Sequence, residues 1–329
     1  MRVLIIHNTS SGFGSDAIFE FQRSLLREGD ECVLRMLVKD AQDKGTSILR
    51  DAEDFDLVVI SGGDGTVTSM LYNLRRRDIL TCVFPSGTAN LFFMSLGNSA
   101  EPSTLARACR IGHSAITDLG EMFWQSEDGT RHREGFSIMA GVGFDAQIME
   151  AAVPAKKAIG QAAYFAAAMA NPKPEVRDFR ITVDGKVHVC RGISCIVANN
   201  AMIQNDIELV PGSTMDDGLL DVIVLEVEET AQLLHPIVAG LVDHGGKNPK
   251  RPNIVSFSGR DVLVESSTPA QLQIDGDTLD SNVSKYRARV LPKSNKLVVD
   301  GLSRYGRDKH SAPLFGDTEE IAFPPLSVS

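Results

Sequence analysis

Val58-Val59-Ile60-Ser61-Gly62-Gly63-Asp64-Gly65-Thr66-Val67 is a segment in which an apolar run leads into three glycines. The apolar run at 57–60 is typical of a parallel strand buried on both faces. Glycines follow it, and residues 67–75 have helical spacing, so exposed N–H groups and a helix N-terminus should together form an anion site. Asp64 would repel a phosphate there unless a divalent cation compensates, which predicts magnesium. The alternative is a tight turn with Asp64 as the helix N-cap.

The first third of the chain alternates strand and helix signals. Strand-like apolar runs lie at 3–6, 32–38, 57–60 and 80–84, and helical spacing occurs at 17–28, 41–53 and 67–75. This order predicts a doubly wound, Rossmann-like α/β nucleotide-binding domain whose ligands sit beyond the carboxyl ends of the strands. A second polar loop, Pro85-Ser86-Gly87-Thr88-Ala89-Asn90, leaves the next strand in the same way. Its Thr88 hydroxyl and Asn90 amide could hold a nucleotide or the neighbouring loop.

Strands dominate from about residue 118. Short strand signals, among them 262–265, 271–274, 285–291 and 297–299, alternate with turn signals such as Asp184-Gly185. They predict an antiparallel β-sandwich, interrupted by helical insertions at 145–170 and 230–241. We therefore expect an α/β domain at 1–117, a β-rich domain at 118–300 and a tail at 301–329 that packs back on the N-terminal domain.

Composition narrows the class of protein. The 329 residues carry a net charge of −10, which argues against a nucleic-acid partner. None of the five cysteines forms a CxxC pair, as expected for a reducing compartment. Met1 leads straight into a strand-like run without a signal peptide, and no apolar run reaches the roughly 18–20 residues that span a bilayer. A cytoplasmic protein without a transmembrane segment is expected.

The ordered set of motifs resembles the diacylglycerol kinase catalytic-domain family. After Gly62–Thr66 and Pro85–Asn90, the chain continues in the family's order with Gly141-Val142-Gly143-Phe144-Asp145-Ala146, with residues 211–222 and with Ile274-Asp275-Gly276-Asp277. The resemblance covers essentially residues 1–300. The family includes sphingosine and ceramide kinases and soluble bacterial lipid kinases, and NAD kinases and 6-phosphofructokinases are more distant fold relatives.

The resemblance implies an ATP- and Mg²⁺-dependent kinase that transfers the γ-phosphate to a lipid hydroxyl, with diacylglycerol as the default acceptor. The nucleotide would be lined by loop residues, namely Asn8, Thr9, Gly62, Gly63, Asp64, Gly65, Thr66, Thr88 and Asn90. Asp277 would deprotonate the hydroxyl, while Asp64 and Asp118 would belong to a magnesium and water network near the phosphates. Thr214 and Leu219, through backbone carbonyls, would hold a structural Mg²⁺ together with Asp217. The alternative for residues 216–218 is a simple hairpin turn.

The same resemblance implies that the lipid is met at a membrane surface or in a micelle, during transient visits from the cytoplasm. The protein could be a monomer or a homodimer.

Departures from the family pattern keep other functions open. Asp277 stands where the family usually has glutamate, so the carboxylate reach shortens by about 1.3–1.5 Å. Leu91 follows Asn90 where the family commonly has aspartate, so one carboxylate of the magnesium network is missing. Thr9 stands where proline is usual. The alternatives are a nucleotide-binding protein with weak or no kinase activity and an NAD kinase, which shares Gly62–Thr66; the downstream motifs follow the lipid-kinase order.

Overall fold

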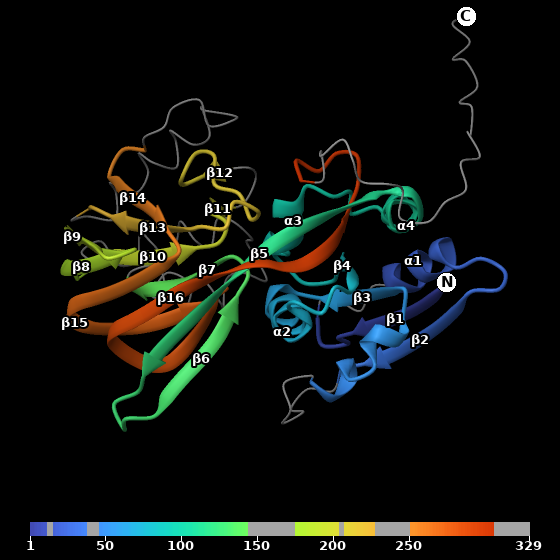
Figure 1. The fold of residues 1–329 in the computed structure, drawn as a ribbon, viewed down its shortest axis with the longest axis horizontal. Helices are drawn as coiled ribbons and strands as arrows, with labels where there is room; N and C mark the ends of the chain where they lie inside the picture. Colours follow the sequence, from blue (N-terminus) through green and yellow to red (C-terminus); the bar gives the residue numbers. More distant parts are fainter. Residues whose placement is uncertain (12–15, 38–45, 144–174, 204–206, 228–250, 306–329) are drawn as a thin grey trace, which may run out of the picture.

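The computed structural model describes residues 1–11, 16–37, 46–143, 175–203, 207–227 and 251–305. Within these ranges fourteen strands form one continuous sheet, and two short strands form another. Figure 1 shows helices gathered around one half of the molecule and strands filling the other. The predicted helical insertions at 145–170 and 230–241, and residues 306–329 of the predicted tail, lie outside the described residues.

The N-terminal half is a parallel sheet flanked by helices, as its strand–helix alternation predicts. The sheet order is β4-β3-β1-β2, with β1 (Arg2–His7), β2 (Glu31–Met36), β3 (Leu57–Gly62) and β4 (Leu80–Pro85). The helices are α1 (Ala17–Leu25), α2 (Asp64–Leu74), α3 (Leu91–Leu96) and α4 (Pro102–Ile111), with short 3₁₀ turns η1 (Ser47–Leu49) and η2 (Ala52–Asp54). Every residue of β3 is buried, which explains its uninterrupted apolar run.

The C-terminal half is antiparallel. Its strands are β5 (His113–Gln125), β6 (Arg131–Phe136), β7 (Met139–Gly143), β8 (Arg177–Val183), β9 (Lys186–Gly192), β10 (Ser194–Ala198), β11 (Met202–Ile203), β12 (Ile207–Glu208), β13 (Leu220–Leu225), β14 (Ile254–Gly259), β15 (Asp261–Ile274) and β16 (Asp277–Val299). A second apolar core lies among these strands, with Tyr286, Phe136 and Phe179 fully buried in it. The predicted class, α/β followed by an antiparallel β-sandwich, is confirmed.

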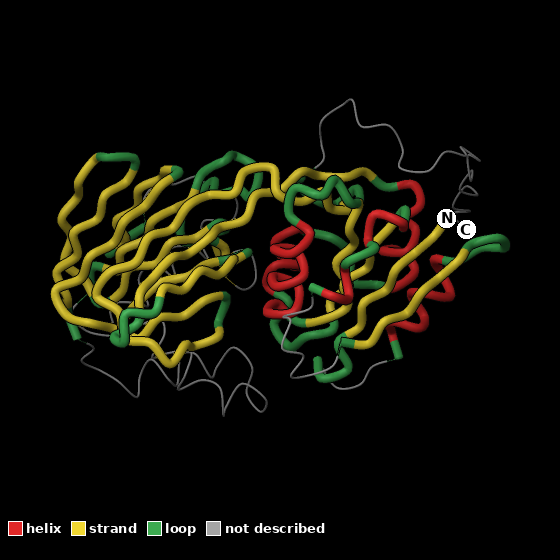
Figure 2. Tube along the Cα trace, turned by 60° about the horizontal axis from the view of Figure 1, so that its bottom comes forward, coloured by secondary structure: helices red, strands yellow, loops and turns green. Residues whose placement is uncertain are grey.

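Two long strands join the halves. β16 pairs with β15 in the C-terminal half, and its Lys296 and Leu297 run parallel to β4 in the N-terminal half. β5 follows β16 along most of this path, and the two cross the middle of the molecule side by side (Figure 2). The expected domain boundary at 117/118 falls inside β5, at the point where its pairing with β16 shifts register between Thr117 and Leu119.

Two expectations about individual elements are wrong. The helix expected at 41–53 is replaced, in its described part, by η1 and η2, where Arg35 pairs with Asp51 and Arg77 with Glu53. The separate strands expected between 262 and 299 are parts of β15 and β16. Register shifts between Glu265 and Ala270 and between Leu291 and Asn295 let each strand bend and still continue.

The described start of the predicted tail contacts the N-terminal half. The Ser303 hydroxyl donates to the Leu96 carbonyl at 2.5 Å, and the Ser99 N–H donates to Asp300 at 2.6 Å. Tyr305 is buried. Among the described helices, none is long and apolar enough to cross a membrane.

Candidate active site

The glycine loop, residues 62–66, joins β3 to α2. Gly63 is the N-cap and α2 begins at Asp64, so Asp64 is not the cap. The Asp64 Oδ1 instead accepts the N–H of Phe92 at 3.0 Å, which ties the loop to α3. The first-turn N–H groups of a helix lack partners within the helix, so this helix start can receive the oxygens of an anion.

The second loop, residues 85–90, lies directly against the glycine loop. The Ser86 N–H donates to the Gly62 carbonyl at 3.1 Å, and the hydroxyls of Ser61 and Ser86 are 2.7 Å apart. A Cβ added to Gly87 would stand 2.4 Å from the Gly63 Cα. The two loops can approach this closely only because both positions are glycine, and they form one wall.

Replacing Gly87 by alanine is expected to weaken nucleotide binding by about 10–100-fold. The new methyl group would collide with the Gly63 backbone, so the loops would have to separate and the N–H groups would lose their alignment. Calorimetric titration with ATP and magnesium measures the affinity. Gly301→Ala is the matched control, because a Cβ at Gly301 meets no atom within 4 Å. Equal affinities of the two variants would contradict this role of Gly87.

The turn after β1, at residues 8–11, contacts the same helix start. The Asn8 Nδ2 donates to the Thr66 Oγ1 at 2.7 Å, and the Gly63 N–H donates to the Ser11 Oγ at 3.3 Å. Thr9 is exposed between these contacts. The structure therefore brings together Asn8 and the glycine loop, which are far apart in sequence.

Asn90 holds its own loop. It adopts a left-handed conformation, with φ of 49°, its Nδ2 donates to the Gly87 carbonyl at 2.8 Å, and its Oδ1 accepts the Gly87 N–H at 2.8 Å. This role within its own loop is neither of the two that the sequence leaves open for Asn90, and a nucleotide contact stays a prediction. Thr88 is exposed at the loop tip, and Leu91 packs against the apolar core.

Asp277 reaches the glycine loop through a tight hairpin. The turn between β15 and β16 consists of Asp275 and Gly276 alone, with φ of 47° and 87°, as a type I′ turn requires. Asp277 then lies at the start of β16, and its Oδ2 would be 3.2 Å from a Cβ on Gly65. An exposed carboxylate therefore stands beside the helix start that could hold a phosphate.

Asp275 anchors this hairpin and was missed as a site residue. Its Oδ1 accepts the N–H groups of Ile138 and Met139, each at 2.9 Å. Its Oδ2 accepts the Ser137 N–H at 2.7 Å, the Ser137 hydroxyl at 3.1 Å and the Thr68 hydroxyl of α2 at 2.6 Å. Burial raises the pKa of Asp275, and these donors oppose the rise. The Asp-Gly pair between two strands is the sequence signal that could have identified it.

Asp118 contacts the loop at 213–219. It is buried, its Oδ2 accepts the Gly218 N–H at 2.7 Å, and its Oδ1 accepts the Lys293 N–H at 2.7 Å. Its own N–H donates to the Met215 carbonyl at 2.6 Å. Burial raises the pKa of Asp118. The network that Asp118 is expected to share with Asp64 stays a prediction.

The predicted metal residues lie on this loop in an acidic neighbourhood. The Asp217 Oδ1 accepts the Leu219 N–H at 2.8 Å. Partial burial raises the pKa of Asp217, and the charges of Asp221, Asp118 and Asp216 raise it further. A divalent cation would relieve this repulsion, and a set of oxygen donors including Thr214 suits Mg²⁺. Over the described part of the chain, no three His, Cys, Asp or Glu side chains are arranged as metal ligands. The predicted Mg²⁺ site uses only one such side chain, that of Asp217, because its other protein ligands are backbone carbonyls.

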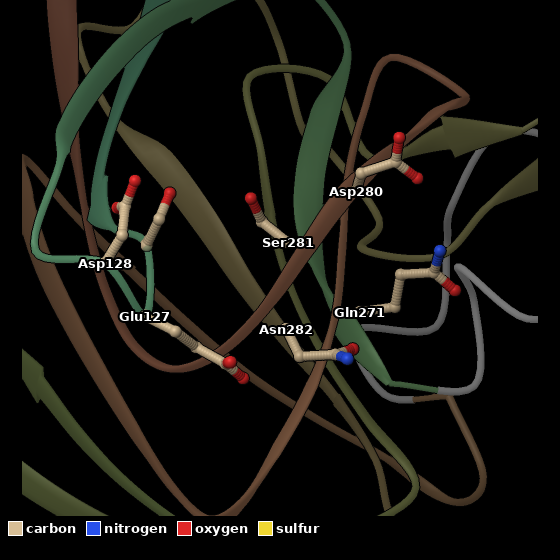
Figure 3. Close-up of a pocket in the computed structure, with 7 residues that line it drawn as sticks. Glu127, Asp128, Gln271, Asp280, Ser281 and Asn282 are labelled. Atoms are coloured by element: carbon tan, nitrogen blue, oxygen red, sulfur yellow. The ribbon is translucent and has the colours of Figure 1, made fainter.

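Figure 3 shows a polar hollow of about 560 Å³ away from the predicted residues. Its labelled carboxylates are Glu127 and Asp128, in the turn between β5 and β6, and Asp280 on β16. None of the predicted site residues lines it. Its carboxylates would repel a phosphate, so this hollow does not suit a nucleotide.

Two protein-family models match the chain in succession. The model of the diacylglycerol kinase catalytic domain matches residues 2–122, and the model of the YegS C-terminal NAD kinase beta sandwich-like domain matches residues 138–299. Between them they cover both halves of the fold and the residues described above.

Individual relatives are more distant. An uncharacterized protein of Synechocystis sp. is 27% identical over 248 residues, 74% of this chain but 55% of that protein, so the chain spans about half the length of this relative. A diacylglycerol kinase of Staphylococcus aureus (strain Newman) is 25% identical over 231 residues, 68% of this chain and 69% of that one.

Solved structures share the fold. A diacylglycerol kinase structure from Bacillus anthracis (strain Sterne) matches with a TM-score of 0.61 at 19% identity, over 92% of this chain and 98% of that one. A further structure from the same organism matches with a TM-score of 0.68 at 17% identity, over 91% and 97%.

Proposed function

This chain belongs to the diacylglycerol kinase catalytic-domain family, and on that premise we propose that it is an ATP- and Mg²⁺-dependent lipid kinase. It transfers the γ-phosphate of ATP to the hydroxyl group of a lipid. Diacylglycerol is the default acceptor for this family. The lipid is met at a membrane surface or in a micelle.

The position of Asp277 carries this proposal. Its carboxylate stands beside Gly65 at the helix start, where an acceptor hydroxyl would approach a bound phosphate. A general base must lie within hydrogen-bond reach of the proton that it removes. In the proposed step the lipid oxygen forms a bond to the γ-phosphorus, the bond from that phosphorus to the bridging oxygen breaks, ADP leaves, and Asp277 accepts the hydroxyl proton.

The remaining residues bind and position. The helix start at Gly63–Thr66 holds phosphate oxygens, and Asn8 holds Thr66 in place. Thr9 and Thr88 are exposed at the rim of the same wall and would contact the nucleotide. Magnesium at the phosphates would neutralise their charge beside Asp64, as it does in phosphoryl transfer generally.

A second Mg²⁺, bound to the loop at 213–219, would stabilise the folded protein. Asp217, with the carbonyls of Thr214 and Leu219, would hold it. The residues fit such an ion because partial burial and the neighbouring carboxylates both raise the pKa of Asp217. A folded-state pKa above the ordinary value means that Asp217 contributes stability below pH of about 4 and loses it as the pH rises through the folded pKa. A cation offsets this loss.

Magnesium is therefore expected to raise the melting temperature at neutral pH, and Asp217→Asn should abolish the increase. At a concentration 100 times the dissociation constant, one bound ion adds about 2.7 kcal/mol of stability. Without metal, Asp217→Asn should melt no lower than the parent. Asp128→Asn is the matched control, because the Asp128 Oδ1 accepts an N–H two residues ahead, from Thr130, and its pKa is lowered. An undiminished magnesium effect in Asp217→Asn would refute this site.

One observation favours a second candidate function. Leu91 packs against the core where family members carry a carboxylate, so Asp64 has no acidic partner from that position. A protein that binds the nucleotide and transfers phosphate weakly or not at all would accommodate this change. An NAD kinase is the third candidate, and the match to the lipid-kinase motif order speaks against it.

Mass spectrometry after incubation with a whole lipid extract, ATP and magnesium separates the three functions. The lipid-kinase proposal predicts one lipid class heavier by a phosphate group, and no such product with Asp277→Ala. A phosphorylated NAD⁺ in a parallel reaction would favour the NAD kinase. Nucleotide binding without any phosphorylated product would favour the binding protein.

A further inference from the structure

A second hollow, of about 290 Å³, lies where the two halves of the molecule meet. We call it the hinge hollow, and it is bounded by the end of α2, the start of β4 and the bulge of β16. Its lining includes the cations Arg76, Lys293 and Lys296, the carboxylate Asp78, and the apolar Ile79 and Ile116. Since α2 has eleven residues and begins at the glycine loop, the hollow is about 16 Å from that loop.

The hinge hollow carries more positive than negative charge among the described residues. Among the three arginines that follow α2, Arg75 lies over the Tyr72 ring and Arg77 pairs with Glu53. Arg76 forms no salt bridge with any described residue, and neither does Lys293 across the same ranges. Lys296 and Asp78 are 3.7 Å apart, and the Asp78 side chain is 88% exposed. Three cations thus stand against two carboxylates, Asp78 at the hollow and Asp118 beside the Lys293 backbone, in a chain whose net charge is −10.

Backbone strain is concentrated at the same two cations. Among the described residues, seven that are not glycine have positive φ, and five of them are Asn or Asp, which tolerate it. The other two are Arg76, with φ of 60°, and Lys293, with φ of 52°. Hydrogen bonds hold both, because the Arg76 N–H donates to the Ser294 carbonyl and the Lys293 N–H donates to Asp118, each at 2.7 Å. Strain of this kind gathers at functional sites.

We propose that the hinge hollow is a binding site for a phosphate monoester, supplied either by a lipid headgroup or by a small soluble phosphate. Arg76 and Lys293, which form no salt bridge with a described residue, complement the negative charge of a phosphate monoester, whose oxygens accept several charge-assisted hydrogen bonds. The volume is below that of most nucleotide-sized pockets, and Ile79 and Ile116 offer contact for a few carbon atoms.

The site is connected to both predicted functional regions. Its walls are formed by α2 and β16. The Asn295 Nδ2 of β16 donates a hydrogen bond to the Leu71 carbonyl of α2 at 3.0 Å, which joins the two elements. The other end of α2 carries the glycine loop, and Lys293 contacts Asp118. A ligand that bridges Arg76 and Lys293 therefore stabilises the junction between the halves.

Two probes test the site, both at constant ionic strength: inorganic phosphate, followed by calorimetry, and phosphatidylcholine vesicles with and without phosphatidic acid, followed by co-sedimentation. At least one should bind the parent protein, and each removed cation should weaken that binding about tenfold. Arg76→Gln together with Lys293→Gln is the test variant. Lys186→Gln together with Arg191→Gln is the charge-matched control, because both residues lie on β9, away from the hollow.

The outcomes decide the matter. Loss confined to vesicles with phosphatidic acid assigns a lipid headgroup, and loss for inorganic phosphate assigns a soluble ligand. Equal binding by the parent and the double variant, or no binding of either probe to the parent, overturns the proposal. Lys293→Gly covers the case in which the double variant does not fold, because glycine accepts φ of 52° at that position. It should show the same tenfold loss.

Discussion

Replacing Asp277 by asparagine is expected to lower the turnover of lipid phosphorylation by about 10²–10⁴-fold and to leave the fold intact. Asparagine has almost the same shape but cannot accept the proton of the acceptor hydroxyl. Asp277 is exposed, so the free energy of unfolding should change little. The affinity for the nucleotide should also be kept, because the loops that bind it are unchanged.

Two companion variants sharpen this result. Asp280→Asn removes an exposed carboxylate from the same strand and should leave turnover unchanged. Asp277→Glu lengthens the side chain by one methylene group on the exposed side of Gly65, so it should retain turnover to within about tenfold. If Asp277→Asn turns over as fast as Asp280→Asn, then Asp277 is not the base.

Asp275→Ala is expected to produce the largest loss of stability, about 3–5 kcal/mol. The change would leave the N–H groups of Ser137, Ile138 and Met139 without their acceptor in a buried site, and the Thr68 hydroxyl would lose its bond as well. The hairpin would then lose its anchor to α2, so turnover should fall together with stability. Urea unfolding measures the free energy.

The chain offers a matched control in a second Asp-Gly hairpin. Asp184 and Gly185 join β8 to β9, Asp184 has φ of 48°, and its carboxylate accepts the N–H groups of Arg260 and Asp261. These bonds are exposed to solvent, so Asp184→Ala should cost only about 1 kcal/mol and leave turnover unchanged. If the two variants lose the same stability and turnover, then Asp275 only stabilises its own turn and does not position Asp277.

The glycine loop and its surroundings could be predicted because the signals are local. The buried run at 57–60 and the glycines after it specify a strand, a tight turn and a helix start without any distant contact. The helix expected at 41–53 was wrong because its apolar spacing is irregular, and contacts with Arg35 and Arg77 decide its conformation. Bends in β15 and β16 were missed because a bulge leaves only a weak trace in the sequence.

The site was harder to predict where it depends on contacts between distant segments. Asp118 was identified as acidic and central, but its partners Gly218 and Lys293 come from loops far along the chain. Asp275 was visible only as a turn residue, since its role comes from Thr68 and residues 137–139. Asn90 could not be assigned from sequence, because the two roles open to it use the same amide group.

Transfer of labelled phosphate tests the central claim most directly. The protein would be incubated with γ-labelled ATP, magnesium and a whole lipid extract, and the label in the organic phase would be counted for the parent chain and for Asp277→Asn. We expect label in a lipid with the parent and about 10²–10⁴-fold less with the variant. Nucleotide bound tightly by the parent without label in any lipid would contradict it.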